Sequence, residues 1–359
     1  MKKNVKTMTI IAILCSLLVS CGQKENAPKV DDATENASIQ VLTNNLFKID
    51  MPQKFDGMYE TMVKDNAILI FDKECKDEGY EALVVGIYAF ENPEDWAIGP
   101  TNKVGELILN NGKLYDIVLS YPTESQYGFD RDMPAKYKTL YDARFEIASC
   151  VVGLDGEKVE VGKGCKGENL YKEVLGKHMT ALDEKWDATT LENNNMSTMY
   201  ATIANGEGNI YDKVGYVYED INVDGIEELM IGEIADGDWK GTIYDIYTMV
   251  DRKPQHVVSG WDRNRYYVLD SMILNEASGG AGETDYMVYD LVSNSTELFF
   301  QYGFKYDEYT DKGNPYFRSY DNNEENRNWE SITETDFKEM QDRVSNRKQF
   351  DYIPFSKLK

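Results

Sequence analysis

The sequence predicts an α+β protein, in which an N-terminal antiparallel sheet with one helix is followed by a helix-flanked antiparallel β-meander domain. Short apolar runs separated by turn residues recur over 40–122 and again over 214–304, a pattern typical of antiparallel strands. Helical periodicity is confined to a few stretches, chiefly 135–150, 170–186 and 335–344. Hydrophobic residues make up 42% of the chain, enough to fill real cores. Strands and helices in separate runs indicate the α+β class.

The strands of the N-terminal half follow from alternating polarity and from turn residues. We predict strands at 46–51, 58–63, 68–71, 82–90, 107–109 and 114–121. Residues 64–67 are a hairpin candidate, and Asn110-Asn111-Gly112-Lys113 is a strong one, because Asn-Gly accepts the positive φ of tight hairpin turns. Met133-Pro134 then opens a helix at 135–150, whose apolar residues recur with a period near 3.6.

The second half begins with helices and continues as a meander. Residues 152–167 form a glycine-rich linker or an exposed hairpin, and helices follow at 170–186 and 196–203. Strands are predicted at 216–219, 229–234, 243–250, 256–261, 265–269, 271–274, 286–291 and 298–304, with turns that include 278–280. A loop over 306–328, a helix at 335–344 and an extended segment at 352–355 complete the chain. Ser331-Ile332-Thr333-Glu334 has the form of a capping box for this last helix.

The first twenty residues have the features of a secretory signal. Three lysines precede an apolar run from Met8 to Val19, which is shorter than the roughly 20 residues of a spanning helix. The run ends in Leu18-Val19-Ser20-Cys21, which resembles the lipobox of bacterial lipoproteins. The alternative is an ordinary signal peptide with a stray cysteine. We predict a signal peptide at 1–20 and lipid on Cys21, which would anchor the chain to a bacterial membrane, facing outside the cytoplasm.

Composition divides the remaining chain and limits its partners. Residues 21–38 are polar and without periodicity, and we interpret them as a lipidated, disordered tether. The glycine-rich segment after residue 152 separates an N-terminal domain, 39–152, from a C-terminal domain, 168–359. Asp and Glu total 63 against 38 Lys and Arg, a net charge of −25. This charge argues against a nucleic-acid partner, because phosphate contacts need clustered basic residues.

The cysteines of the predicted mature chain do not define a disulfide framework. Cys75, Cys150 and Cys165 remain besides Cys21, and an odd number leaves at least one thiol unpaired. Two alternatives stay open: Cys150 and Cys165 pair, or all three are free. None of the three has the spacing of a metal knuckle.

One motif predicts a specific ion. Residues 220–228 read D-x-N-x-D-G-x-x-E, with side-chain oxygens at alternate positions and Gly225 permitting a tight turn. The expected ligands are Asp220, Asn222, Asp224, the carbonyl of Ile226, and Glu228. Calcium takes six to eight oxygen ligands, so the sequence predicts a structural Ca²⁺ site. An EF-hand would need a glutamate where Ile231 lies, and it would need helical flanks. The alternative is a polar hairpin held by Asx-type hydrogen bonds.

The loop and its surroundings resemble known protein groups. The nine-residue loop resembles the calcium-binding β-hairpin loops of integrin-type propeller (FG-GAP) repeats. Residues 45–150, with GIYAFENPEDWA and KLYDIVLSYPTE, and residues 214–283, with YEDINVDGIEELMIGE and SGWDRNRYY, resemble uncharacterised lipoproteins of gut Firmicutes. This resemblance implies surface display and no particular activity. For the N-terminal half it also suggests a PsbP-like α+β sandwich, which is a fold analogy only.

A second segment is a candidate ligand-binding surface. Trp261, Arg263, Arg265 and Tyr266 combine aromatic faces with guanidinium groups, which are enriched at recognition sites. The alternative is that alternate members fill the core of the sheet while the arginines offset an acidic surface. The glycine-rich residues 278–282 lack the lysine of a P-loop and the spacing of a dinucleotide-binding turn, so we interpret them as a turn.

These features favour a lipid-anchored extracytoplasmic binding or interaction module for an unknown extracellular ligand or protein. One alternative is a cell-surface hydrolase acting on glycan or peptidoglycan, with carboxylates drawn from Asp236, Asp238 and Glu276. No G-x-S-x-G motif occurs, and a catalytic histidine would have to be His178 or His256. We expect His178, on an apolar helix stripe, to be buried and hydrogen-bonded. A solute-binding lipoprotein would require repeated βαβ units. No catalytic residue is predicted.

Overall fold

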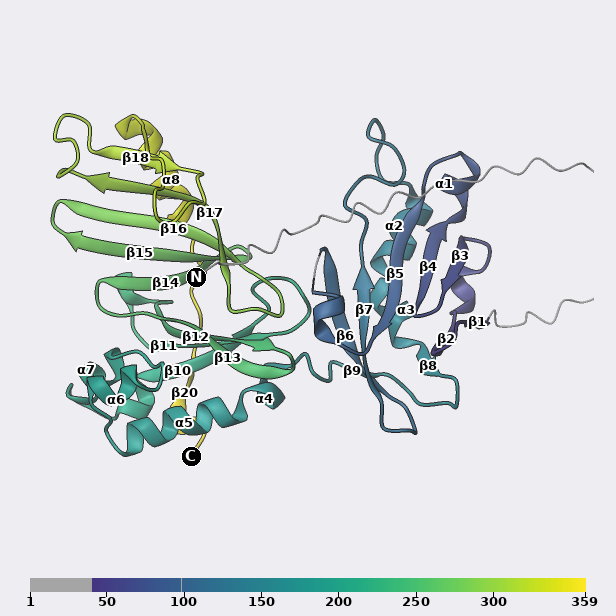
Figure 1. The fold of residues 1–359 in the computed structure, drawn as a ribbon, viewed down its shortest axis with the longest axis horizontal. Coiled ribbons are helices and arrows are strands. Elements are labelled where there is room, and N and C mark those ends of the chain that lie inside the picture. Colours follow the sequence, from purple (N-terminus) through teal and green to yellow (C-terminus); the bar gives the residue numbers. More distant parts are fainter. Residues whose placement is uncertain (1–40, 98) are drawn as a thin grey trace, which may run out of the picture. The chain divides into compact units, whose positions relative to one another are not determined.

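The computed structural model describes residues 41–97 and 99–359, which fall within the unit Ile39–Lys359 (Figure 1). Antiparallel sheets and helices make up this unit, which confirms the predicted α+β class. The predicted signal peptide 1–20, the lipid-bearing Cys21 and the tether 21–38 lie outside the described residues.

The first part of the unit contains two antiparallel sheets, with strand orders β1-β2-β8 and β3-β4-β5-β7-β6-β9. Their strands are β1 (Val41–Thr43), β2 (Phe47–Asp50), β3 (Tyr59–Lys64), β4 (Ala67–Asp72), β5 (Leu83–Phe90), β6 (Thr101–Ile108), β7 (Leu114–Ser120), β8 (Val151–Gly153) and β9 (Glu160–Val161). Both predicted hairpins are present, joining β3 to β4 and β6 to β7. Val152 bridges Lys158 in antiparallel fashion, so the segment after residue 152 contains a hairpin rather than a bare linker.

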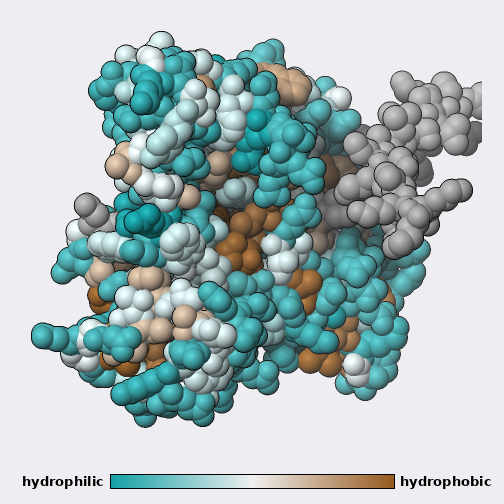
Figure 2. All heavy atoms as spheres, turned by 60° about the vertical axis from the view of Figure 1, so that its left-hand side comes forward, coloured by the Kyte–Doolittle hydropathy of each residue, from teal (hydrophilic) through white to brown (hydrophobic). Residues whose placement is uncertain are grey.

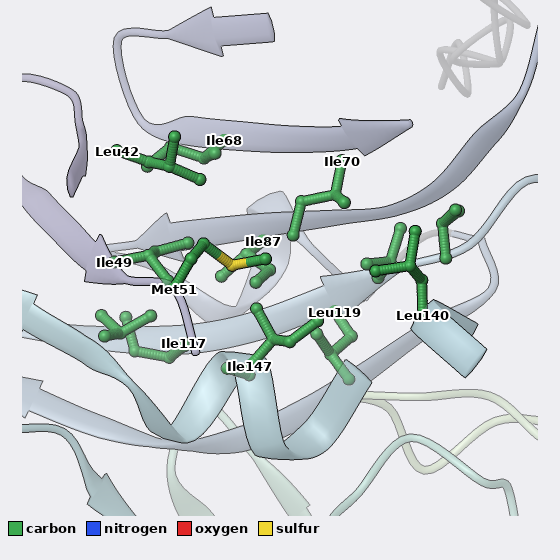
Figure 3. Packing of buried hydrophobic residues seen from close by; sticks show 14 of the residues in the cluster. Leu42, Ile49, Met51, Ile68, Ile70, Ile87, Ile117, Leu119, Leu140 and Ile147 are labelled. Carbon is green, nitrogen blue, oxygen red and sulfur yellow. The ribbon is translucent and has the colours of Figure 1, made fainter. Parts of the chain in front are cut away.

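Two short helices pack on this part, where the sequence predicts one. α2 (Ala135–Asp142) and α3 (Arg144–Ser149) are separated at Ala143, whose φ of −88° and ψ of 2° interrupt the helix. Leu140 of α2 and Ile147 of α3 are fully buried and lie near strand residues such as Leu119 of β7 (Figure 3). The remaining helix, α1 (Lys73–Asp77), begins at Asp72, whose side chain accepts a hydrogen bond from the Cys75 amide.

Four helices follow between the sheets in the sequence: α4 (Gly167–Leu170), α5 (Lys172–Asp183), α6 (Ala188–Glu192) and α7 (Met199–Ala204). α5 and α7 correspond to the predicted helices. α6 was not predicted, and its start is defined by Asp187, whose side chain accepts a hydrogen bond from the Thr190 amide. Tyr171, Leu175 and Leu182 form a buried cluster with residues of the large sheet.

The second part of the unit is a large antiparallel sheet with strand order β19-β18-β17-β16-β15-β14-β12-β11-β10-β20, and β13 also pairs with β12. The strands are β10 (Val214–Glu219), β11 (Glu228–Glu233), β12 (Ile243–Val250), β13 (Lys253–Ser259), β14 (Asn264–Leu269), β15 (Met272–Gly280), β16 (Glu283–Leu291), β17 (Leu298–Asp307), β18 (Tyr316–Ser319), β19 (Glu330–Ser331) and β20 (Ile353–Pro354). α8 (Glu334–Ser345) packs against β17 and β18, as expected for a helix-flanked meander (Figure 1).

Three local predictions in this part were wrong. The predicted turn at 278–280 lies within β15, which continues past a register shift as far as Gly280. The predicted loop over 306–328 contains β18, which pairs with β17. The capping box is formed by Thr333 and Asp336 rather than by Ser331 and Glu334, because Ser331 belongs to β19 and pairs with Phe317.

The surface is mostly hydrophilic on the side drawn in Figure 2, with apolar residues exposed in separate patches. Within the described residues, no helix combines the length and the apolar character needed to cross a membrane.

Candidate functional site

The predicted calcium loop connects two neighbouring strands of the large sheet. β10 and β11 pair in a register that ends with Glu219 opposite Glu228, so residues 220–227 form the connection. Val223 (φ 59°) and Gly225 (φ 90°) both have left-handed backbone conformations. A β-branched residue rarely adopts this conformation, because its Cβ crowds the backbone. The contacts of neighbouring residues must therefore hold the turn.

The first three side chains of the motif supply these contacts. Asp220 accepts hydrogen bonds from the amides of Asp224 (3.1 Å) and Gly225 (3.0 Å), and Asn222 Oδ1 accepts from the Asp224 amide at 3.2 Å. Asp224 Oδ1 accepts from the Ile226 amide at 2.9 Å. This is the Asx-type bonding expected of the polar hairpin, and it turns the acidic groups toward the loop backbone.

Glu228, the first residue of β11, is the most deeply buried acid of the loop. Its side chain is fully buried, with Oε2 accepting from the Ile221 amide at 2.8 Å and Oε1 from the Thr248 hydroxyl at 3.0 Å. Asp224 is only 4% exposed. Among the described residues, neither acid has a Lys, Arg or His within ion-pair distance.

The partly exposed acids beside the loop are paired, in contrast to the buried ones. Glu219 forms an ion pair with Lys348 at 2.6 Å, and Glu227 forms one with Lys166 at 2.8 Å. The two acids near the surface thus have lysine partners, whereas the buried Asp224 and Glu228 have none among the described residues. Burying an unpaired carboxylate costs free energy, unless a bound cation compensates its charge.

Burial and mutual repulsion govern the acidity of the inner groups. Burial raises the pKa of Glu228 well above the usual glutamate range, and the charge of Asp224 raises it further. Burial likewise raises the pKa of Asp224, to which the charge of Asp220 contributes. The hydroxyl of Tyr171 is buried without a hydrogen-bond partner among the described residues, and its pKa is raised by burial and then by the charges of Glu228 and Asp224.

The donor chemistry of the loop fits a hard cation. An ionised carboxylate offers about four lone-pair sites, and the hydrogen bonds above use one or two sites on each acid. Oxygens of Asp220, Asn222, Asp224, Glu228 and the Ile226 carbonyl therefore remain available to an ion that prefers oxygen ligands. In the described structure no three His, Cys, Asp or Glu side chains are already gathered as a metal cluster, so a bound ion would have to draw these groups together.

The loop packs against β6 and against the segment before α4. The Lys103 amide donates to the Asp224 carbonyl at 2.6 Å, and Asn102 Nδ2 donates to the Val223 carbonyl at 3.3 Å. On the other side, the Glu227 amide donates to the Cys165 carbonyl at 2.9 Å. The loop is thus bonded to segments that precede it by some 60 to 120 positions.

Two cavities adjoin these contacts. The larger has a volume of about 440 Å³ and is bordered by β6, by residues 161–166 and by the loop from Glu219 to Glu227. The smaller, about 90 Å³, is bordered by Trp96, Lys103, Glu106, Asp116 and Arg252, among others.

A buried ion network forms the polar wall of the smaller cavity. Asp116 is fully buried and lies 2.9 Å from Lys103 Nζ and 3.0 Å from Arg252 Nη2, and it accepts a hydrogen bond from the Trp96 indole at 3.1 Å. Lys103, 3% exposed, also pairs with Glu106 at 3.2 Å. Lys103 and Arg252 balance the charges of Asp116 and Glu106. The acids at this cavity are therefore compensated, unlike the buried acids of the calcium loop.

The predicted ligand-binding residues lie at the β13–β14 turn and along β14. Trp261, 48% exposed, pairs with Asn264 across the turn, and Arg263 is exposed beside it. The Arg265 guanidinium lies 3.7 Å from the ring centre of Trp239. Tyr266 packs partly against the sheet core, as the core alternative expects for alternate residues of a strand.

Comparisons with protein-family models, with curated proteins and with solved structures found no match to this chain. The resemblance to gut lipoproteins and to FG-GAP loops therefore stays a prediction.

The histidines occupy different environments. His178 is buried and hydrogen-bonded as predicted, with Nε2 3.0 Å from the Tyr247 hydroxyl, and burial lowers its pKa to about 4. His256 Nε2 lies 2.9 Å from Ser259 Oγ and 3.3 Å from Asp245 Oδ1, a grouping that the sequence analysis missed.

The grouping around Asp245 is not arranged as a catalytic triad. A triad places histidine between serine and aspartate through its two ring nitrogens, whereas here one nitrogen faces both and the Ser259 hydroxyl donates directly to Asp245. Asp245 also accepts hydrogen bonds from the Tyr200 hydroxyl at 2.6 Å and from the Ser197 amide. It therefore anchors the start of α7 to β12.

The predicted acidic candidates lie in β15 and at a short 3₁₀ helix. Glu276 pairs with Arg347 at 2.6 Å, and Asp236 is exposed before a short turn of 3₁₀ helix; the side chain of Asp238 lies outside the described residues. Cys75, Cys150 and Cys165 are all free, so the pairing of Cys150 with Cys165 that the sequence left open is not formed.

Proposed function

We propose that this chain is a lipid-anchored extracytoplasmic lipoprotein that acts as a binding module, and that its 220–228 loop holds a structural Ca²⁺ ion. The lipobox at Cys21 and the basic and apolar segments before it support the anchor. The buried and unpaired Asp224 and Glu228 support the ion, and this observation carries the calcium part of the proposal.

Two neighbouring carboxylates inside a protein have two ways to avoid the cost of burial. They bind protons, or they share a cation. The spacing of oxygen donors at positions 1, 3, 5, 7 and 9 favours the cation, and the absence of nitrogen or sulfur donors in the loop favours calcium over transition metals. The ion would join the ends of β10 and β11 and would be structural.

Binding rather than catalysis is the role that we propose for the folded unit. Support comes from the larger cavity beside the loop, which lies in the volume range of small-ligand sites, about 300–1,000 Å³. No observation among the described residues favours the hydrolase or the solute-binding alternative over this one.

The calcium part is tested by thermal unfolding in EDTA and in calcium. The sample is the chain from residue 22, which retains the whole compact unit. A ligand at about 100 times its Kd adds about 2.7 kcal/mol to the free energy of unfolding, so we expect a clear rise in Tm with calcium. Asp224→Ala should abolish the rise, whereas Glu227→Gln, which changes an acid of the same loop that is not a proposed ligand, should preserve it. An equal Tm in both buffers would overturn the calcium proposal.

The anchor is tested separately in cells. Cys21→Ser should move the chain from the membrane fraction to the soluble fraction, because lipid on the cysteine is the proposed means of attachment. A variant that stays in the membrane fraction as wild type does would contradict the lipid anchor. Substituting the free Cys150 by serine is the matched control, and it should leave the distribution unchanged.

A further inference from the structure

The larger cavity has chemically distinct walls. Phe145 of α3, 40% exposed, and Val161 of β9, 60% exposed, supply apolar surface at the cavity, and Tyr218 of β10 supplies a second ring. Apolar groups that are exposed to water cost free energy. Where such groups gather at one cavity, they indicate a ligand-binding surface. Flat rings in particular offer faces against which a ring-shaped ligand can pack.

The polar groups of the cavity are mainly hydrogen-bond acceptors. Glu219, Asp220 and Glu227 are acidic; Glu219 pairs with Lys348 and Glu227 with Lys166, but each carboxylate has about four lone-pair sites and can accept further hydrogen bonds. Lys103 is engaged with Glu106 and Asp116, and Lys166 with Glu227. An anionic ligand would therefore meet carboxylates and no free cation. A purely apolar ligand would remove water from those carboxylates without replacing the lost hydrogen bonds.

The calcium loop forms one wall, and it also holds the others in place. Its Asp224 carbonyl accepts a hydrogen bond from β6, and its Glu227 is hydrogen-bonded to the segment before α4, through the Cys165 carbonyl and through the Gly167 amide at 2.9 Å. Calcium would cancel most of the negative charge of Asp220, Asp224 and Glu228, and Glu219 and Glu227 are paired with lysines, so little net negative charge remains to favour a cationic ligand. A neutral ligand with many hydroxyl groups is the class that remains.

We propose that this cavity binds a neutral sugar, and that calcium in the adjoining loop is required for binding. The inference rests on the proposed calcium-loop function. Hydroxyl groups of the sugar would donate to the acceptor side chains, and the apolar face of its ring would pack on Phe145 and Tyr218. Calcium would act by fixing the loop and therefore the spacing of the walls.

The test measures binding of four disaccharides, maltose, cellobiose, lactose and N,N′-diacetylchitobiose, by saturation-transfer NMR and calorimetry. The chain from residue 22 is used in calcium and in EDTA. We expect at least one disaccharide to bind in calcium, with an affinity at least tenfold lower in EDTA. Phe145→Ala should weaken binding at least tenfold as well. Phe129→Ala, which removes a ring that is 84% exposed and does not line the cavity, should leave it unchanged.

Each other outcome counts against the inference. Absence of binding to all four sugars, in a sample whose Tm rises with calcium, would overturn it while leaving the calcium proposal intact. Equal binding in EDTA would overturn the calcium requirement, and binding that survives Phe145→Ala would place the sugar elsewhere. Spermidine is the cationic probe; if it binds and the sugars do not, the ligand class is wrong. A sample whose Tm does not respond to calcium would refute the proposed calcium site first.

Discussion

Replacing Glu228 by glutamine should change the stability of the fold in opposite directions with and without calcium. Glutamine has the shape of glutamate, and its carbonyl can still accept the hydrogen bond from the Ile221 amide. Without calcium, the substitution removes a fully buried carboxylate that has no basic partner among the described residues. With calcium, the same substitution removes a proposed ligand. Wild type should therefore be the less stable protein in EDTA and the more stable one in calcium.

The structure gives a rough size for both effects. A buried ion without a partner costs several kcal/mol, and hydrogen bonds to a charged acceptor return about 1.5–3 kcal/mol each. Glu228 accepts two such bonds, so a net gain of about 1–2 kcal/mol is expected for Glu228→Gln in EDTA. Calcium at about 100 times its Kd adds about 2.7 kcal/mol to wild type. A hundredfold loss of affinity in the variant removes about 2.3 kcal/mol of that gain, which exceeds what the variant gains in EDTA and makes wild type the more stable protein in calcium.

Urea unfolding followed by tryptophan fluorescence measures the difference directly. Both proteins are unfolded at neutral pH, in calcium and in EDTA, and the free energies of unfolding are compared. Glu227→Gln is the control, because Glu227 lies in the same loop but pairs with Lys166 at the surface. If Glu228→Gln destabilises the protein equally in both buffers, Glu228 is a structural acid held by Ile221 and Thr248, and the reasoning from its missing partner fails.

Three further predictions concern the rest of the unit. Asp116→Asn should cost about 3–5 kcal/mol in urea unfolding, because it leaves the buried Lys103 one anion short; adding Lys103→Met should recover part of the loss, and no recovery would contradict the pairing. Ile147→Ala should cost about 2–5 kcal/mol, against about 0.5 kcal/mol or less for the exposed Phe145→Ala, and equal costs would contradict the packing. Burial lowers the pKa of His178 from 6.5 to about 4, so its contribution is complete above pH 6.5 and falls by up to about 3 kcal/mol as the pH drops toward 4. His178→Gln should show a shallower loss over that range in acid unfolding, and an identical slope would rule the assignment out.

Much of the fold could be predicted because most strands are marked in their own short stretch of sequence by apolar residues and flanking turn residues. β5 and β12 are buried along most of their length, so each is a largely apolar run bounded by turn residues and can be recognised without knowing its neighbours. The wrong predictions concern strand residues that lie in polar or glycine-rich stretches. β18 is four residues long within a polar stretch, and only its pairing with β17 defines it. The glycines at the end of β15 suggest a turn, but there the strand continues through a register shift.

The candidate site likewise contains one part that could be predicted from the sequence and one part that could not. The loop motif is contained in nine consecutive residues, so its spacing could be read directly. The cavity could not be predicted, since its walls come from β6, β9 and β10, and no periodicity in the sequence relates these strands. The grouping of His256 and Ser259 with Asp245 was missed for a similar reason, because it depends on the register shift between β12 and β13.

Gly225 connects the local motif to the distant walls. The sequence explains this glycine by the tight turn, and its φ of 90° agrees with that reason. The structure adds a second one: a Cβ at this position would clash with the Lys103 carbonyl and would crowd Asn102. The neighbouring Val223 carbonyl, in turn, is bonded to Asn102, 121 positions earlier in the chain. A residue that permits the turn thus also permits the close approach of β6, which is how a nine-residue motif can position a cavity built from remote segments.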